Sequence, residues 1–282
     1  MNSLVKRTIS GLVFVVVMAE CIVAGRASFI AIWAVVAALC MWEFLTIARK
    51  TGVRSERIFT ILAGLAVVLS VALEAGTVGG VISTLAIVLM FMMQLFCKEQ
   101  GQMGKLAYSS LSLVYIALPI ALLTTLDPIL VFCYITVIWA NDTGAYLVGI
   151  AIGKHKMAPE ISPKKSWEGF FGGILFAVGV ALVWYALYWS KEDFGMVQAF
   201  GPEVALNPLA VKLKWLGFGL VTAASAVAGD LIESKFKRSA GVKDSGKLIP
   251  GHGGALDRFD SVMISAPVVW CYVMLVDILA IA

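Results

Sequence analysis

The stretch from Pro128 to Ile152, PILVFCYITVIWANDTGAYLVGIAI, decides the solvent in which this chain folds, because it carries a single charged residue, Asp142. A helix needs roughly 20 predominantly apolar residues to cross the hydrocarbon core of a bilayer. The stretch is therefore predicted to be a membrane-spanning helix, with the polar segment around Asp142 in one half of it.

The rest of the chain has the same character. Of its 282 residues 60% are hydrophobic and 14% are charged, whereas charged residues make up about 25% of an average soluble domain. We predict an all-α, polytopic integral membrane protein that forms a single domain over residues 1–282. About nine transmembrane helices are expected, at residues 8–25, 28–48, 58–75, 78–97, 107–126, 128–152, 168–190, 209–231 and 261–282.

The basic residues predict an orientation. If the N-terminus is cytoplasmic, 18 of the 22 Lys and Arg residues fall on the cytoplasmic side of these spans and four on the other. Cytoplasmic loops retain Lys and Arg, so the N-terminus is predicted to be cytoplasmic and the C-terminus outside. The excess positive charge also suits anionic lipid headgroups and soluble phosphates, although a topogenic signal alone would explain it.

The carboxylates are more informative than the bases, because acids at membrane depth are costly and usually serve a pathway, a relay or a ligand. With the predicted topology, most of them fall at one level, near the cytoplasmic boundary. This predicted polar layer comprises Glu43, Asp142, Glu168, Asp230, Glu233, Asp257 and Asp260.

Spacing within this layer suggests a metal ion. Asp257 and Asp260 are three residues apart, as are Asp230 and Glu233, so each pair lies on one face of a helix. An oxygen-ligated divalent cation would neutralise such a pair, and Mg²⁺ prefers a few carboxylates together with waters and substrate phosphates. The alternative is ion pairing with the flanking bases, Lys235, Lys237, Arg238 and Arg258.

Two basic loops are predicted to bind phosphate. In LIPGHGGALD, residues 248–257, Pro250 fixes a turn, the glycines can adopt positive φ, and a helix is expected to begin near Ala255. Successive N–H groups and a helix N-terminus favour anions there, with Lys243, Lys247 and Arg258 as nearby cations. His252 could position a phosphate or merely hydrogen-bond its own turn.

The second loop, GKHKMAPEISPKKSWEGFFGG at residues 153–173, lies on the same predicted side of the membrane. It contains Lys154, Lys156, Lys164 and Lys165, and Ser166 is positioned to cap the following helix. Both loops together suggest that a polyphosphate is held by cations and metal over a lipid phosphate. His155 is interpreted as one more cationic or solvated loop residue.

One segment resembles a known family. The run SKFKRSAGVKDSGKLIPGHGGALDRFD, residues 234–260, is similar to the signature of the phosphatidate cytidylyltransferases, or CDP-diacylglycerol synthases. NDTGAY and SPKKSWEG also look like upstream motifs of that family. The resemblance implies a bacterial inner-membrane enzyme of phospholipid biosynthesis that joins CTP and phosphatidic acid into CDP-diacylglycerol, releases pyrophosphate, requires Mg²⁺ and forms a homodimer.

The residues and the resemblance together give a set of candidate roles, carried by the C-terminal part of the chain, about 128–282, with the active site facing the cytosol. The candidate catalytic residues are Asp230, Lys237, Arg238, Lys243, Asp257, Arg258 and Asp260. The candidate substrate-binding residues are Asp142, Lys164, Lys165, Ser234, His252, Gly253 and Gly254. The candidate metal ligands are Asp230, Asp257 and Asp260, with Asp142 as a ligand or a support.

The expected chemistry is attack by a phosphate oxygen of phosphatidate on the α-phosphorus of CTP, which depends mainly on positioning and charge neutralisation. Membrane lipids are expected partners and nucleic acid is not. Two alternatives remain: a secondary transporter, in which Asp142 and Asp230 carry ions, and a cytidylyltransferase for another lipid phosphate. Acyl-chain preference, metal number, any second cation, the dimer interface and helix packing order stay open.

Overall fold

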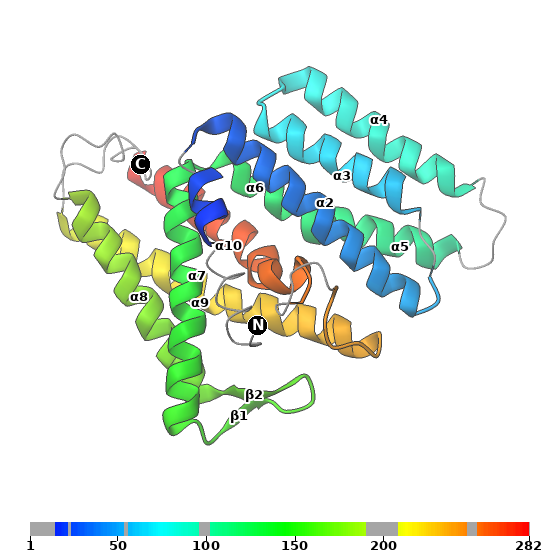
Figure 1. Ribbon diagram of the computed structural model, residues 1–282. Helices are drawn as coiled ribbons and strands as arrows, with labels where there is room; N and C mark the ends of the chain where they lie inside the picture. The colour runs from blue at the N-terminus through cyan, green and yellow to red at the C-terminus, as the bar shows by residue number, and fades with distance from the viewer. Residues whose placement is uncertain are drawn as a thin grey trace. The chain divides into compact units, whose positions relative to one another are not determined.

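The computed structural model describes residues 15–21, 24–53, 56–95, 102–189, 208–246 and 253–281, and they are mostly α-helical. Residues 15–21 form a short helical segment. The labelled helices (Figure 1) are α2 (Arg26–Lys50), α3 (Arg57–Ala72), α4 (Gly76–Leu95), α5 (Gln102–Ser112), the π-helix η1 (Leu113–Ala117), α6 (Leu118–Thr125), α7 (Pro128–Ile152), α8 (Trp167–Trp189), α9 (Pro208–Ser239) and α10 (Leu256–Ile281).

The all-α prediction is confirmed, with one addition. In the described ranges, seven helical segments are long and apolar enough to cross a membrane: α2, α4, the run Met103–Thr125, α7, α8, α9 and α10. The predicted span at 58–75 corresponds to α3, which is apolar but shorter, at 16 residues. The predicted span at 8–25 lies largely outside the described residues, so the count of nine stays a prediction.

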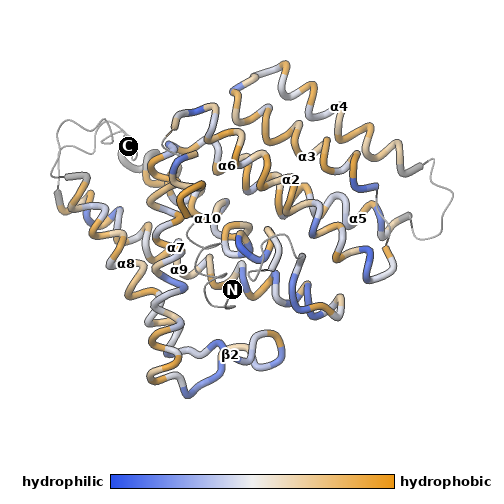
Figure 2. Tube along the Cα trace, in the orientation of Figure 1, coloured by the Kyte–Doolittle hydropathy of each residue, from blue (hydrophilic) through white to orange (hydrophobic). Residues whose placement is uncertain are grey.

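The helix bounds agree with the hydropathy prediction in α7 but not in α9, which continues into a charged segment. α7 has the predicted bounds, whereas α9 extends eight residues beyond the predicted end at 231, to Ser239. The extension contains an ion pair from Lys237 to Glu233, one helical turn earlier, which supports helix where apolar residues end. Figure 2 shows hydrophobic residues along most of the helical length and hydrophilic ones in the hairpin that carries β2.

The addition is a two-stranded antiparallel sheet in the loop between α7 and α8. Strands β1 (Lys156–Ala158) and β2 (Ser162–Ser166) pair with each other, with Lys156 opposite Ser166. Only a basic loop was predicted here, and the lysines and Pro163 of this segment show none of the alternation of apolar and polar residues that indicates a strand.

The chain divides into two compact units. The first unit comprises residues 1–128 and 233–263, and the second comprises residues 129–232 and 264–282. The prediction of a single domain stays a prediction.

In the first unit, α3 packs against α2, α4 and α6, and Figure 1 shows α2, α3 and α4 side by side. An aromatic core joins α2 to the end of α9 and to the start of α10, both of which belong to the signature run 234–260. Phe236 packs edge-on against Phe44 and Tyr115, with ring centroids 5.9 and 5.4 Å apart. Phe259 packs against the fully buried Trp33 at 5.7 Å. The end of α9 and the start of α10 are thereby held against α2.

In the second unit, small residues bring α7 and α8 close together. A Cβ on Gly173 would lie 2.6 Å from the amide oxygen of Asn141, and one on Gly169 would lie 2.8 Å from the carbonyl oxygen of Ala145. Gly169 and Gly173 form a G-x-x-x-G pattern, which allows helices in membranes to approach closely. Away from these glycines, Trp184 of α8 donates its indole N–H to Thr136 of α7 at 2.8 Å.

Candidate functional site

Lys237 is the centre of a buried charge cluster in the first unit. Its ammonium group lies 2.6 Å from Oδ1 of Asp257 and also forms an ion pair with Glu233. All three side chains are at least 90% buried. One cation therefore faces two carboxylates at a place where water screens their charges poorly.

The signature loop holds the carboxylate of Asp257 from the other side. Its Oδ2 accepts the N–H of Gly254 at 2.8 Å and the N–H of Ser245 at 2.9 Å. Gly253 adopts a φ of +85°, as the sequence analysis expected of this loop, and a Cβ there would lie 2.5 Å from Oδ2. Asp257 is thus fixed by backbone donors and by Lys237 at the first turn of α10.

Glu43 of α2 forms a second layer of contacts behind this loop. Its carboxylate accepts the hydroxyl of Ser245 at 2.7 Å and the N–H groups of Ala255 and Leu256 at 3.0 and 2.9 Å. The side chain is buried, 7% exposed. A charged acceptor therefore satisfies backbone donors at the start of α10, where a helix has no partners of its own for them.

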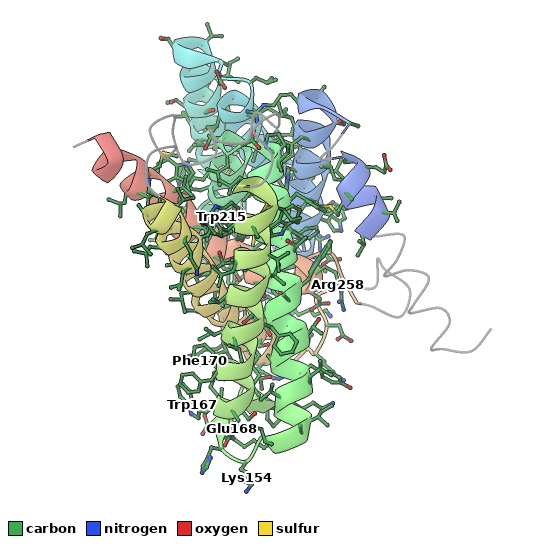
Figure 3. The ribbon with its side chains drawn as sticks, turned by 90° about the vertical axis from the view of Figure 1, so that its left-hand side faces the viewer. Lys154, Trp167, Glu168, Phe170, Trp215 and Arg258 are labelled. Carbon is green, nitrogen blue, oxygen red and sulfur yellow. The ribbon has the colours of Figure 1, made fainter. Side chains whose placement is uncertain are left out.

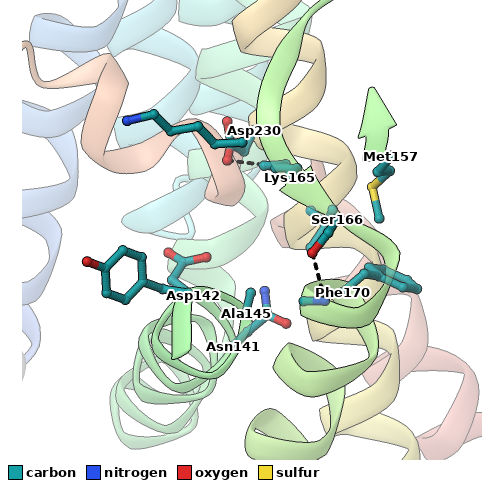
Figure 4. A pocket seen from close by; sticks show the side chains of 12 residues that line it. Asn141, Asp142, Ala145, Met157, Lys165, Ser166, Phe170 and Asp230 are labelled. Carbon is teal, nitrogen blue, oxygen red and sulfur yellow. Dashed lines mark hydrogen bonds and ion pairs between the residues drawn. The ribbon is translucent and has the colours of Figure 1, made fainter. Parts of the chain in front are cut away.

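A cavity of about 260 Å³ lies in the second unit, between α7, the strand β2, the start of α8 and α9. Lys165 of β2 and Asp230 of α9 form an ion pair of 2.6 Å at its wall (Figure 4). The polar residues that line it are Asn141, Asp142, Lys164, Lys165, Ser166 and Asp230. Both cations and carboxylates therefore face one cavity, as a mixed-charge ligand such as a metal-bound phosphate requires.

Asn141 lines this cavity, but the residue is buried, 1% exposed, and neither the oxygen nor the nitrogen of its amide has a hydrogen-bond partner in the described part of the chain. We expect Asn141→Leu to raise the melting temperature of the purified protein, because an unsatisfied buried amide costs about 1–3 kcal/mol. Thermal unfolding in detergent, without nucleotide, measures this.

Asn141→Ala is the control for this prediction. It also removes the amide but leaves a space, so it should gain less stability than Asn141→Leu. A lower melting temperature for Asn141→Leu would mean that the amide has a stabilising partner and would contradict the prediction.

The hairpin end of α8 is fixed by Glu168 and Ser166. The carboxylate of Glu168 accepts the backbone N–H groups of Lys154 and His155 and lies 2.5 Å from Nδ1 of His155. Ser166 accepts the N–H of Gly169 at 3.2 Å, which confirms the predicted helix cap. Figure 3 shows Lys154, Trp167 and Glu168 gathered at this end. Glu168 therefore organises the loop, and His155 is its partner while its side chain stays exposed to solvent, as predicted.

The structure thus places the predicted residues in two groups. Lys237, Asp257, Gly253 and Gly254 meet in the first unit, and Asp142, Lys164, Lys165 and Asp230 line the cavity of the second. Ser234 is buried, Lys243 and Arg258 are exposed, and Arg238 donates to the carbonyl of Val242. His252, with Lys247 and Pro250, lies outside the described residues.

The carboxylates that are three residues apart in the sequence have separate partners in the structure. Asp230 pairs with Lys165, whereas Glu233 pairs with Lys237, so these two acids do not share one partner. Asp260 accepts the N–H of Ser261 at 2.6 Å. In the described residues, no three or more His, Cys, Asp or Glu side chains gather into a metal-binding group. The assignment of metal ligands stays a prediction.

Sequence reasoning missed Ser245 and Asn141 and assigned no role in the site to Glu43 or Glu233. Glu43 was placed in the predicted polar layer, but its contacts with residues more than 200 positions away have no signature in one sequence. The signal for Ser245 was its place in KDSGK between the two cationic residues Lys243 and Lys247.

Comparison with known proteins adds to this geometry. A phosphatidate cytidylyltransferase of Mycobacterium bovis is 37% identical over 142 residues, which is 50% of this chain and 40% of the relative. The corresponding proteins of Haemophilus influenzae and Staphylococcus epidermidis are 43% identical over 142 residues and 45% identical over 131. These matches cover 49% and 46% of this chain, and 43% and 44% of the relatives.

The chain therefore aligns with less than half the length of these relatives. The model of the cytidylyltransferase family matches residues 5–276, nearly the whole chain. The chain belongs to the cytidylyltransferase family.

Proposed function

We propose that this protein is a phosphatidate cytidylyltransferase that converts CTP and phosphatidic acid into CDP-diacylglycerol and pyrophosphate. The observation that carries the proposal is the buried cluster of Lys237, Asp257 and the Gly253–Gly254 backbone within the family signature. The names of the relatives from three bacterial genera support the same reaction.

In the proposed reaction, a phosphate oxygen of phosphatidate attacks the α-phosphorus of CTP. A new P–O bond forms there, the bond between the α-phosphorus and the bridging oxygen of the β-phosphate breaks, and pyrophosphate leaves. The attacking oxygen already carries negative charge, so the protein does not need to remove a proton from it. The protein needs instead to position the two substrates and to neutralise the charge of their phosphate groups.

Basic residues are proposed to bind the phosphate groups. In the first unit these are Lys237, Arg238, Lys243 and Arg258, with Ser234 as a hydroxyl contact. In the second unit these are Lys164 and Lys165, which line the same cavity as Asp142 and Asp230. Cations at such sites neutralise charge that develops on the transferred phosphoryl group and on the leaving pyrophosphate.

Mg²⁺ is the proposed cofactor, with Asp257 and Asp260 of α10 as candidate ligands. Asp257 and Asp260 offer hard carboxylate oxygens on one helix face, and Mg²⁺ is usually held by one or two carboxylates plus substrate phosphates and waters. When bound, the ion would polarise phosphoryl oxygens. Asp230 and Asp142, in the second unit, remain predicted ligands whose carboxylates line the cavity.

The proposed setting is the bacterial cytoplasmic membrane, as a homodimer with the active site facing the cytosol. Seven candidate spans in the described residues support membrane integration, and the lopsided Lys and Arg distribution supports the orientation. In this setting, CTP arrives from the cytosol and phosphatidate is supplied from the bilayer.

Pyrophosphate release tests the proposed function. Purified protein in mixed micelles is supplied with CTP, phosphatidic acid and Mg²⁺, and each component is omitted in turn. Release that requires all three, with a CDP-lipid product, is expected. If a well-folded sample releases no pyrophosphate, the enzyme proposal is wrong, and ion flux in sealed vesicles would then test the transporter alternative.

We expect Lys165→Gln to lower kcat/KM for CDP-lipid formation about 10- to 100-fold, the equivalent of a lost charge-assisted hydrogen bond of roughly 1.5–3 kcal/mol. Lys165 lies in the cavity wall and pairs with Asp230, so its loss also leaves that carboxylate without this partner. Initial rates at varied CTP measure the effect.

Lys156→Gln is the matched control for this prediction, because Lys156 lies on β1 of the same hairpin and is exposed. It should retain wild-type kcat/KM. Equal losses in both variants would show that general hairpin charge, rather than the cavity wall, matters.

A further inference from the structure

Glu43 of α2 forms hydrogen bonds that connect the N-terminal part of the first unit to the signature segment, residues 234–260. Its two carboxylate oxygens accept three hydrogen bonds, one from the hydroxyl of Ser245 and two from the N–H groups of Ala255 and Leu256. It lies in α2, 202 residues before Ser245. None of the candidate site residues predicted from the signature lies in this part of the chain.

The contacts of Glu43 lead to Asp257 through Ser245. The Ser245 hydroxyl donates to Glu43 at 2.7 Å and accepts the N–H of Asp257 at 3.3 Å. The N–H of Ser245 in turn donates to the carboxylate of Asp257 at 2.9 Å. Ser245 is therefore hydrogen-bonded to both Glu43 and Asp257, and its position depends on both acids.

The glycines of the loop fit closely around this carboxylate. A Cβ on Gly254 would overlap the carboxylate of Glu43 and the hydroxyl of Ser245, and a Cβ on Gly246 would also meet Glu43. Any side chain at either position would displace the loop or Glu43. The glycine at 254 thus serves close approach, whereas only Gly253 of this pair has a positive φ.

Glu43 is buried, so each donor that faces it depends on its two oxygens. An amide in its place has one acceptor oxygen with two lone pairs, so it cannot accept from three donors at once. A glutamine at this position would turn an N–H₂ group toward a backbone N–H or the Ser245 hydroxyl. The start of α10, which orients Asp257, would lose a charge-assisted contact.

We propose that Glu43 is a positioning residue for the transfer reaction: it fixes Ser245 and the first turn of α10, so that Asp257 faces Lys237. This inference rests on the proposed function. Residues that orient a ligand or an acid through one intermediate typically contribute 10- to 100-fold to activity or metal affinity.

The test compares wild type with Glu43→Gln in the mixed-micelle assay. We expect kcat to fall about 10- to 100-fold and the Mg²⁺ concentration for half-maximal rate to rise, while KM for phosphatidate stays near the wild-type value. Glu74→Gln is the matched control, because Glu74 is an exposed acid of the same unit, and it should behave as wild type.

Ser245→Ala keeps the inference testable if Glu43→Gln does not fold, because it removes only the hydroxyl that links the two acids. It should show the same fall in kcat and rise in half-maximal Mg²⁺. If both variants fold, the double variant should lose less than the product of the two single losses, since residues in one network are not additive.

The outcomes separate the two claims. If wild type forms no CDP-lipid, the proposed function is wrong and the role of Glu43 falls with it. If wild type is active and Glu43→Gln or Ser245→Ala folds with wild-type kcat and half-maximal Mg²⁺, the positioning role alone is wrong. Multiplicative losses in the double variant would also overturn the link through Ser245.

Discussion

Asp257→Asn is expected to lower CDP-lipid formation about 10²- to 10³-fold, the loss typical for removal of one electrostatic group from a reaction centre. The change keeps the shape of the side chain but removes the charge that faces Lys237 at 2.6 Å. It also replaces one oxygen, which accepts hydrogen bonds, by an amide that donates them, beside the N–H groups of Ser245 and Gly254. Initial rates at limiting and at saturating Mg²⁺ measure the effect.

The control for this variant is Asp127→Asn. Asp127 is an exposed carboxylate of the same unit, outside the signature, so its replacement should leave the rate unchanged. Wild-type turnover of Asp257→Asn at limiting Mg²⁺ would show that this carboxylate neither holds the metal nor orients the phosphates. A melting temperature measured beside each rate distinguishes lost chemistry from lost folding.

Hydropathy predicted much of the helical architecture. The bounds of α7 agree with the prediction, and α10 begins at Leu256, one residue after the expected start near Ala255. These features depend on local properties: the length of an apolar run, and a glycine turn before it. Gly253 has the positive φ expected in this loop for the same reason.

Tertiary partners could not be predicted in this way. Asp230 and Glu233 share a helix face by spacing, yet one pairs with Lys165 and the other with Lys237. The spacing limits which way each side chain points, but the partner depends on which element packs there. The hairpin of β1 and β2 was missed because its strands contain lysines and a proline instead of alternating apolar residues.

The contact of Glu43 with the signature shows the same limit most clearly. Glu43 was predicted to lie in a polar layer, and that prediction needed only the direction in which α2 crosses the membrane. Its hydrogen bonds to Ser245 and to the start of α10 depend on how two distant segments pack around Trp33 and Phe259. A single sequence contains no period or motif that pairs such segments.

Lys237→Met is expected to abolish measurable CDP-lipid formation and to destabilise the protein by about 3–5 kcal/mol, the cost of leaving buried charge without its partner. Methionine can fill the space of the lysine stem but cannot neutralise Asp257 or Glu233, which are 10% and 1% exposed at the side chain. Activity and thermal unfolding in the same detergent measure the two effects.

The two effects of Lys237→Met can be separated by a second change, Glu233→Gln, which removes one of the two buried charges. The double variant should recover part of the lost stability, because only Asp257 then lacks its cation, but it should recover no activity, because the proposed phosphate contact is still missing. Lys235→Met, an exposed change on the same helix, should retain both properties of wild type. Recovered activity in the double variant would mean that Lys237 serves only to neutralise Glu233, and that the phosphate groups are bound by other cations.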